Sequence, residues 1–241
     1  MRARNTGERL DALPAHLKPK NFAESQAVMD AVDRLVGEPI VGTKIAAKPG
    51  EEVVYAPLPA GRIFHSPARI PRALSPSQYM ECEISFRLTC DLPPRQNDYT
   101  EQEVFDALEA CAAFELVDSR FRDLKSAMAR TPYEFYADHI ANGAMVFGRF
   151  RNDWQKFDFT KTRVSMKQGS KTIIEKTGGH PTGNPARPAA VLANLRRDTT
   201  GLKAGTFIVT GSFTGFHPVE LNQPVIGEFE GFGTMEAVIV G

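Results

Sequence analysis

The sequence predicts an α+β fold, with a helical segment at residues 1–40 followed by a β-rich domain at 41–241. Apolar residues recur at helical spacing between Phe22 and Val36. Beyond Ile40 this pattern gives way to short apolar runs separated by glycine and proline, which is typical of strands joined by turns. A chain of 241 residues, 42% of them apolar, is also long enough to bury one substantial core.

The first helix is expected to begin at Asn21. This residue can cap the helix, and Glu24, three residues later, can complete a capping box. The apolar pattern continues to Val36, after which Gly37 and Pro39 end it. We expect the helical segment to pack on the domain that follows it rather than to fold independently.

The rest of the chain is expected to form strands interrupted by two helices. The predicted strands lie at 40–47, 62–65, 79–89, 144–147, 163–168, 206–210 and 236–240. The predicted helices lie at 101–114 and 188–197. Two long loops, 48–60 and 178–187, are expected to shape a binding pocket, because long loops in compact domains are often functional.

Composition excludes several classes of protein. Lysine plus arginine and aspartate plus glutamate number 29 each, so no global basic field would attract nucleic acid or an anionic membrane. No apolar run is long enough to span a membrane, and the first residues lack the apolar core of a secretion signal. Cys82, Cys90 and Cys111 have no metal-site spacing and are expected to be reduced core thiols. Together these features predict a cytoplasmic protein.

The most informative segment is the predicted strand at 79–89. Its residues alternate between apolar and polar, so Glu81 and Glu83 would lie on one face of the strand. Two carboxylates this close repel each other unless a positive charge lies between them. A hard divalent cation that prefers oxygen ligands, such as Mg²⁺ or Mn²⁺, would provide that charge. The alternative is an exposed polar face on which both glutamates are solvated.

A second acidic segment follows the helix predicted at 101–114. Glu115 and Asp118 adjoin apolar residues, so at least one of them is expected to be half-buried and to need a partner. Arg120 could be the partner of Asp118. Alternatively, Glu115 could be a third oxygen ligand beside the two glutamates of the strand.

Six motifs in this chain resemble the 2-keto-4-pentenoate hydratase branch of the fumarylacetoacetate hydrolase superfamily. They are V-G-T-K-I (41–45), E-C-E (81–83), F-E-L-V-D-S-R (114–120), Y-A-D-H-I-A-N-G (136–143), A-A-V-L-A-N (189–194) and T-G-S-F-T (210–214). The motifs occur in order along nearly the whole chain, which makes the series far more specific than any one of them. The resemblance implies a mixed β-roll or β-sandwich of the fumarylacetoacetate hydrolase type.

The resemblance also implies which residues form a site. It implies a Mg²⁺ or Mn²⁺ ion held by three carboxylates, those of Glu81, Glu83 and Glu115. It matches Lys44 to the family's active-site lysine, which would hydrogen-bond the substrate or move a proton. Without the resemblance, Lys44 would be interpreted as a surface lysine at a strand end.

Three further residues match positions near the family's substrate. Ser212 and Thr214 correspond to the segment whose hydroxyl and backbone N–H groups face the substrate, and Asp138 corresponds to a residue that braces the site. From the residues alone, the glycine, serine and threonine around Ser212 would be interpreted as a turn.

The activity that the resemblance implies is that of a lyase in the breakdown of aromatic compounds. The nearest match is a hydratase for a 2-hydroxydienoate or 2-oxo acid such as 2-keto-4-pentenoate, in which the metal stabilises an enolate. The first alternative is a decarboxylase of the 4-oxalocrotonate type, favoured if Arg62 and Arg72 meet a second substrate carboxylate, or another C–C bond enzyme of the superfamily. The second is a non-catalytic partner subunit of the same fold. The family further implies a homo-oligomer and a complex between sister hydratase and decarboxylase.

Three positions differ from the hydratase pattern. No acidic residue stands just before Gly61, where hydratases carry one, and its absence counts against hydration. Asn184 stands where a histidine is usual, while nearby His180 is interpreted as a loop histidine or as a substitute for it. His139 stands where relatives commonly carry asparagine.

Overall fold

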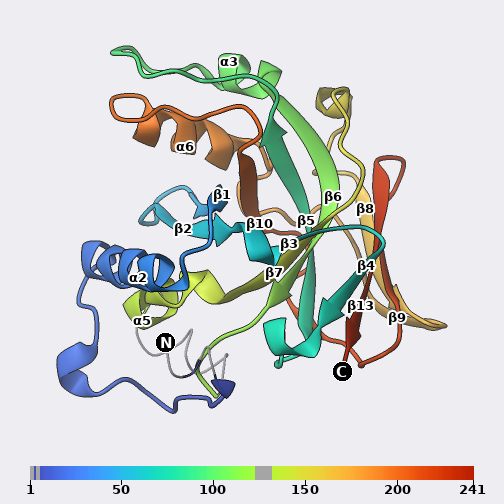
Figure 1. Cartoon of the computed structure of the whole chain (residues 1–241). Coiled ribbons are helices and arrows are strands. Elements are labelled where there is room, and N and C mark those ends of the chain that lie inside the picture. The colour runs from blue at the N-terminus through green and yellow to red at the C-terminus, as the bar shows by residue number, and fades with distance from the viewer. Residues whose placement is uncertain (1–2, 4–5, 123–131) are drawn as a thin grey trace.

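Two β-sheets and a small number of helices make up the fold of the computed structural model (Figure 1). The structure describes residues 3, 6–122 and 132–241. Parts of both predicted segments, 1–2 and 4–5 in the first and 123–131 in the second, therefore lie outside the described residues.

The larger sheet has eight strands and contains the predicted E-C-E strand at its middle. Its order is β2-β1-β10-β5-β6-β7-β3, with β11 paired to β5. The strands are β1 (Ile40–Ala46), β2 (Val54–Pro59), β3 (Ile63–His65), β5 (Tyr79–Leu88), β6 (Leu108–Val117), β7 (Asn142–Phe147), β10 (Phe207–Ser212) and β11 (His217–Pro218). Parallel and antiparallel pairs both occur, since β1 is parallel to β10 and β5 is antiparallel to β6.

The smaller sheet has five strands in the order β4-β13-β12-β8-β9. Its strands are β4 (Ala68–Pro71), β8 (Arg163–Gln168), β9 (Lys171–Thr177), β12 (Val225–Phe229) and β13 (Gly233–Val240). The main core lies between the two sheets, where Phe114 of β6 meets Gly227 and Met235. A Cβ atom on Gly227 would lie 2.7 Å from the Phe114 ring, so only glycine permits this approach.

The helices lie around the larger sheet. They are α2 (Phe22–Val36), α3 (Glu101–Asp106), α5 (Pro132–Ala137) and α6 (Arg187–Arg196), with short 3₁₀ turns η1 (Ala15–Leu17), η2 (Ala60–Arg62), η3 (Arg72–Leu74), η4 (His139–Ala141) and η5 (Trp154–Lys156). None of the helices in the described part of the chain combines the length and apolar character needed to cross a membrane.

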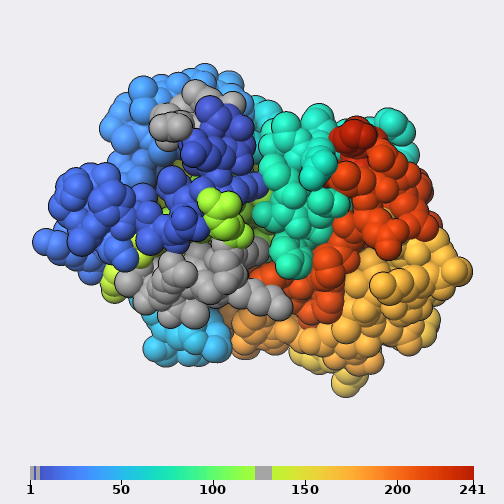
Figure 2. Space-filling model, turned by 90° about the horizontal axis from the view of Figure 1, so that it is seen from below, coloured from blue at the N-terminus to red at the C-terminus, as the bar shows by residue number. Residues whose placement is uncertain are grey.

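Helix α2 packs against α5 and β2 of the β-rich domain (Figure 1). Met29 is fully buried in a cluster with Val54 and Ile140. The Asn21 side chain accepts a hydrogen bond from the Glu24 N–H (2.9 Å), which confirms the predicted cap. The Glu24 carboxylate accepts from the backbone N–H of the residue before the cap (2.8 Å). Seen from below, the N-terminal segment (blue) lies beside yellow-green and teal parts of the chain (Figure 2).

The prediction of one helix at 101–114 is wrong beyond Asp106. The helix α3 is capped by Thr100 with a complete capping box, but Leu108 already begins β6. Almost every residue of β6 is buried, so the strand shows no apolar–polar alternation, and its alanine-rich run resembles a helix in the sequence. The loop predicted at 48–60 also contains a strand, β2, whose prolines obscured it.

The predicted fold class agrees with the structure, and the prediction for the cysteines agrees for two of the three. The α+β class is confirmed by two sheets with few helices. All three cysteines are free, and Cys82 and Cys111 are buried as predicted, whereas Cys90 is exposed and is not a core thiol.

Candidate metal and catalytic site

Three glutamates converge on the face of the larger sheet that points away from the main core. Glu81 and Glu83 lie on β5, and Glu115 of β6 is the direct cross-strand partner of Glu81. One oxygen from each carboxylate lies within 4.8 Å of the other two. Glu81 is 8% exposed and the other two are 0% exposed, so the exposed polar face considered from the sequence is wrong.

Strand β5 alternates as predicted, but both of its faces are covered. Its apolar residues enter the main core, with Cys82 and Ile84 both fully buried. A smaller apolar cluster on the other face, which includes Ala113 and Met145, lies beside the glutamates. The carboxylates are therefore held in a setting of low polarity, where each needs a partner.

Lys44 of β1 supplies one such partner. Its Nζ donates hydrogen bonds to Glu115 Oε1 (2.6 Å) and to the Ile140 carbonyl (3.1 Å). Strands β10 and β5 lie between β1 and β6 in the sheet. In a flat sheet β1 and β6 would lie roughly 14 Å apart, so the contact depends on the curvature of the sheet as well as on the length of the lysine.

The pKa values of the charged groups reflect their burial and crowding. Burial, reinforced by the charge on Glu115, raises the pKa of Glu81 to about 8. Burial, followed by the charges of Glu115 and Glu81, raises the pKa of Glu83 well above its usual range. Burial alone would lower the pKa of Lys44, but the three carboxylates outweigh it and raise that pKa. One ammonium group thus faces three carboxylates, and without a further cation the cluster retains protons.

The cluster fits a divalent cation. Lys44 and the Asn142 side-chain amide (2.9 Å) both donate to Oε1 of Glu115. Oε2 of Glu115 and Oε1 of Glu83 are buried and have no hydrogen-bond partner among the described residues. A buried oxygen without a partner is costly, and two of them beside a third carboxylate form the hard oxygen donor set that suits Mg²⁺ or Mn²⁺.

The segment after β10 borders the carboxylates. Ser212 is opposite Glu83 in the strand register, and the Gly211 N–H donates to Glu83 Oε2 (3.4 Å). The Ser212 hydroxyl accepts from the Thr214 N–H (3.2 Å), and the Thr214 hydroxyl accepts from the Cys82 N–H (2.9 Å). The two predicted substrate-binding residues therefore shape a turn next to the glutamates, and their contact with a substrate stays a prediction.

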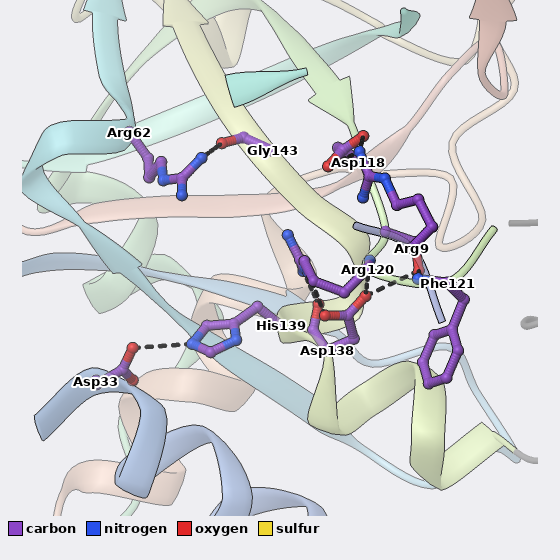
Figure 3. Close-up of polar contacts among 10 residues, drawn as sticks. Arg9, Asp33, Arg62, Asp118, Arg120, Phe121, Asp138, His139 and Gly143 are labelled. Atoms are coloured by element: carbon purple, nitrogen blue, oxygen red, sulfur yellow. Dashed lines mark hydrogen bonds and ion pairs between the residues drawn. The ribbon is translucent and has the colours of Figure 1, made fainter. Parts of the chain in front are cut away.

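Asp138 lies in a separate network of buried charges (Figure 3). Its carboxylate accepts from the Ser119 hydroxyl (2.8 Å), from the Arg120 backbone N–H (2.8 Å) and from the Arg120 guanidinium. Arg9 pairs with Asp118 (2.8 Å) and Arg120 with Asp138, so the alternative in which Asp118 pairs with Arg120 is wrong. A role for Asp138 beside the substrate stays a prediction.

The two arginines considered for a second substrate carboxylate, Arg62 and Arg72, have different neighbours. Arg62 donates to the Gly143 carbonyl (3.1 Å), and its pKa is lowered by burial and by the nearby charge of Arg120. Arg72 lies in η3, against the last residue, Gly241. Of the two, Arg62 alone is shown close to the Arg120 network.

His180 is a loop residue with a buried side chain. Its Nε2 lies 3.0 Å from the Thr210 carbonyl, and its Nδ1 lies 2.9 Å from the Thr182 hydroxyl. Burial lowers its pKa to about 4. The imidazole therefore links the loop to the end of β10, one residue before Gly211.

Sequence reasoning assigned no role to two groups that contact the site. The Ile140 carbonyl is a backbone group, so no side chain indicates it, and only the fold brings it to Lys44. Asn142 belongs to the Y-A-D-H-I-A-N-G motif and begins the apolar strand β7. An amide side chain at the start of an apolar run indicates a buried group that needs a polar partner, and here that partner is Glu115.

Comparison with known proteins supports the predicted relationship. No family model matches the chain. A protein named 2-keto-4-pentenoate hydratase from Paraburkholderia phymatum is 28% identical over 159 residues, which cover 66% of this chain and 59% of that protein. A protein of the same name from Burkholderia vietnamiensis is 24% identical over 221 residues, covering 88% and 82%.

The solved structure of 4-oxalocrotonate decarboxylase from Pseudomonas putida G7, complexed with magnesium and adipate, superposes with a TM-score of 0.79. The match covers 99% of this chain and 94% of that one at 20% identity, which establishes the fold. The predicted resemblance to 2-keto-4-pentenoate hydratases is confirmed by the two relatives. The predicted type of fold is confirmed by a solved structure described as a putative fumarylacetoacetate hydrolase family protein from Yersinia pestis CO92, which superposes with a TM-score of 0.58 at 18% identity over 84% of this chain and 94% of that one.

Proposed function

We propose that the protein is a Mg²⁺- or Mn²⁺-dependent lyase of aromatic-compound breakdown that acts on a small 2-hydroxydienoate or 2-oxo acid, as a 2-keto-4-pentenoate hydratase does. The observation that carries the proposal is the buried cluster of Glu81, Glu83 and Glu115 beside a lysine, in which two carboxylate oxygens have no hydrogen-bond partner within the described part of the chain. The two curated hydratases that resemble the chain support the choice of substrate class.

The three glutamates would hold the cation. When bound, the cation supplies Lewis-acid stabilisation of the negative charge that develops next to a 2-oxo group. The protein contributes the arrangement of the donors, because the register of β5 and β6 holds Glu81 opposite Glu115 before any ligand arrives. The low exposure of all three side chains excludes water and strengthens every charge interaction in the site.

Lys44 would serve as the proton-carrying group. The carboxylates raise its pKa, so its Nζ is charged and can donate a hydrogen bond to the substrate. A cation held by the three glutamates would offset their charge, lower the pKa of Lys44 and so favour proton transfer. Its hydrogen bonds to Glu115 and to the Ile140 carbonyl orient the ammonium. Ser212 and Thr214, in the turn beside Glu83, are proposed to contact the substrate, and Asp138 to brace the site through Arg120.

Decarboxylation of a 4-oxalocrotonate-type diacid is the second candidate. The residues just before Gly61 form the end of β2 and η2 and include no acidic side chain to act with Lys44 in hydration. Arg62 donates one hydrogen bond to a backbone carbonyl, and its guanidinium could also meet a second substrate carboxylate. A non-catalytic partner subunit remains the alternative of another class, and it predicts metal binding without turnover.

The test supplies the purified protein with 2-hydroxypenta-2,4-dienoate, with and without Mg²⁺, and follows the dienol absorbance and the hydrated product. Metal-dependent hydration is the expected result, and Glu83→Gln should abolish it. CO₂ release from 4-oxalocrotonate without hydration would identify the decarboxylase. Turnover of neither substrate, with Mg²⁺ bound, would favour the partner subunit. Light scattering would test the proposed homo-oligomer, and mixing with a sister decarboxylase would test the complex.

A further inference from the structure

One turn of left-handed backbone adjoins the carboxylate cluster. His139, Ile140 and Ala141 have φ values of 56°, 51° and 54° in succession. Apart from glycine, and to a lesser degree asparagine, aspartate and histidine, residues rarely adopt this conformation, and a β-branched residue such as Ile140 is among the least suited to it. Three such residues in a row persist only where the surrounding structure holds them, and such segments gather at functional sites.

The turn contacts both members of the central ion pair. The Ile140 carbonyl accepts from Lys44 Nζ (3.1 Å), and the Asn142 amide, just after the turn, donates to Glu115 Oε1 (2.9 Å). Glu115 Oε1 is also the atom that receives Lys44. A shift of the turn would therefore change the positions of Lys44 and Glu115 together.

Helix α2 holds the turn in place. His139 Nε2 donates to Asp33 Oδ1 at 2.9 Å, and the two side chains are only 4% and 14% exposed (Figure 3). Asp33 belongs to the helix of the N-terminal segment, 106 residues away in sequence. Asp138, the residue just before the turn, accepts hydrogen bonds from the backbone N–H and the guanidinium of Arg120.

We propose that His139 and Asp33 are positioning residues, which hold the left-handed turn so that its Ile140 carbonyl and the Asn142 amide orient Lys44 and Glu115. The N-terminal helix thereby becomes part of the site without touching the substrate. The consequence for turnover rests on the proposed function, but the geometry of Lys44 does not.

The first test measures how fast Lys44 reacts with an amine-acetylating reagent in metal-free protein, read by peptide mass spectrometry. His139→Ala and Asp33→Ala should each speed the reaction roughly tenfold, the factor that corresponds to about 1.4 kcal/mol for the lost Lys44–Ile140 hydrogen bond. His139→Asn should restore slow reaction, because asparagine adopts left-handed backbone and its amide can donate to Asp33.

The matched control is Ser25→Ala. Ser25 is a fully buried residue of the same helix, and its hydroxyl donates to the Tyr133 carbonyl at the start of α5 (2.8 Å), six residues before His139. It should leave the reactivity of Lys44 unchanged. If Ser25→Ala speeds the reaction as much as His139→Ala, the helix acts only through general docking and the proposal is overturned. Unchanged reactivity in both His139→Ala and Asp33→Ala overturns it as well.

The second test applies the same variants to Mg²⁺ titration and to turnover. His139→Ala should weaken Mg²⁺ binding and lower kcat by about 10- to 100-fold with little change in KM, and His139→Asn should recover most of both. The acetylation test needs neither metal nor substrate. A failed lyase assay would therefore count against the proposed function only, and the acetylation rate of Lys44 would still decide the positioning proposal.

Discussion

Lys44 Nζ lies 2.6 Å from Glu115 Oε1, although two strands separate their own strands in the sheet. The lysine uses one oxygen of Glu115 and leaves the other without a partner among the described residues. Glu115 therefore presents one oxygen to Lys44 and leaves one for the proposed metal. This division would link the two proposed functions of the site, metal binding and proton transfer, through a single side chain.

Removing one carboxylate should stabilise the metal-free protein and abolish its response to metal. Without metal, Glu83→Gln is expected to raise the unfolding free energy by roughly 1–3 kcal/mol, and the melting temperature with it. The reason is that the fold no longer has to bury a charge or take up a proton at this position. Mg²⁺ at a hundred times its Kd should stabilise the wild type by about 2.7 kcal/mol and the variant not at all. Thermal unfolding with and without Mg²⁺ measures both effects.

The control for that series is Glu228→Gln, which changes an exposed glutamate of β12. It should keep the wild-type response to Mg²⁺. A full metal response in Glu83→Gln would remove Glu83 from the set of ligands. Glu83 is a cleaner choice than Glu115, whose loss would also leave Lys44 without its partner.

Metal affinity should increase with pH. The pKa of Glu81 is raised to about 8 by burial and by Glu115, so near neutral pH the cation must displace a proton. The Kd for Mg²⁺ should therefore fall as the pH rises towards 8, by at most about tenfold per pH unit for each proton released. Calorimetry in two buffers of different ionisation enthalpy counts the protons. A Kd independent of pH between 6 and 8 would contradict the proton that the raised pKa assigns to Glu81.

Replacing the lysine should separate catalysis from metal binding. Lys44→Met keeps the length of the side chain but removes the charge, and kcat should fall by about 10²- to 10⁴-fold. Loss of the lysine charge also raises the pKa of Glu81 and Glu83 further, so the comparison is made well above pH 8. Once the carboxylates are ionised there, Mg²⁺ should bind at least as tightly as in the wild type, since a competing positive charge is gone. Lys48→Met, which changes an exposed lysine paired with Glu51, is the control for both measurements.

His180 should make the protein lose stability in mild acid. Burial lowers its pKa to about 4 from an ordinary value of 6.5, so between these values the unfolded chain binds a proton that the folded one does not. Its contribution is present above pH 6.5 and declines as the pH falls, by about 2 kcal/mol at pH 5.

Urea unfolding of the wild type and His180→Gln at pH 7 and pH 5 isolates this effect. The variant should show the smaller loss. The comparison with the wild type is required because Glu81 and Glu83, whose pKa values are raised, act in the opposite direction and favour the fold as the pH falls. Equal losses in both proteins would show that His180 does not titrate in this way.

Local patterns predict the elements whose signals lie within a few residues. The cap at Asn21 is local, and so is the period-two run of β5 that places Glu81 and Glu83 on one face. Strand β6 escaped the same reasoning because burial on both faces hides the alternation, so Leu108–Val117 looked like the end of a helix.

By itself the sequence determined that two glutamates share a strand face, since side chains alternate along any strand. It suggested Glu115 as a third ligand only as one of two alternatives, and Lys44 only through family resemblance. Tertiary structure decided the rest. Strand register placed Glu115 opposite Glu81, sheet curvature brought Lys44 to it, and a left-handed turn tied to Asp33 aimed a backbone carbonyl at the lysine. These contacts join residues far apart in the chain, and no short-range pattern encodes the distance between them.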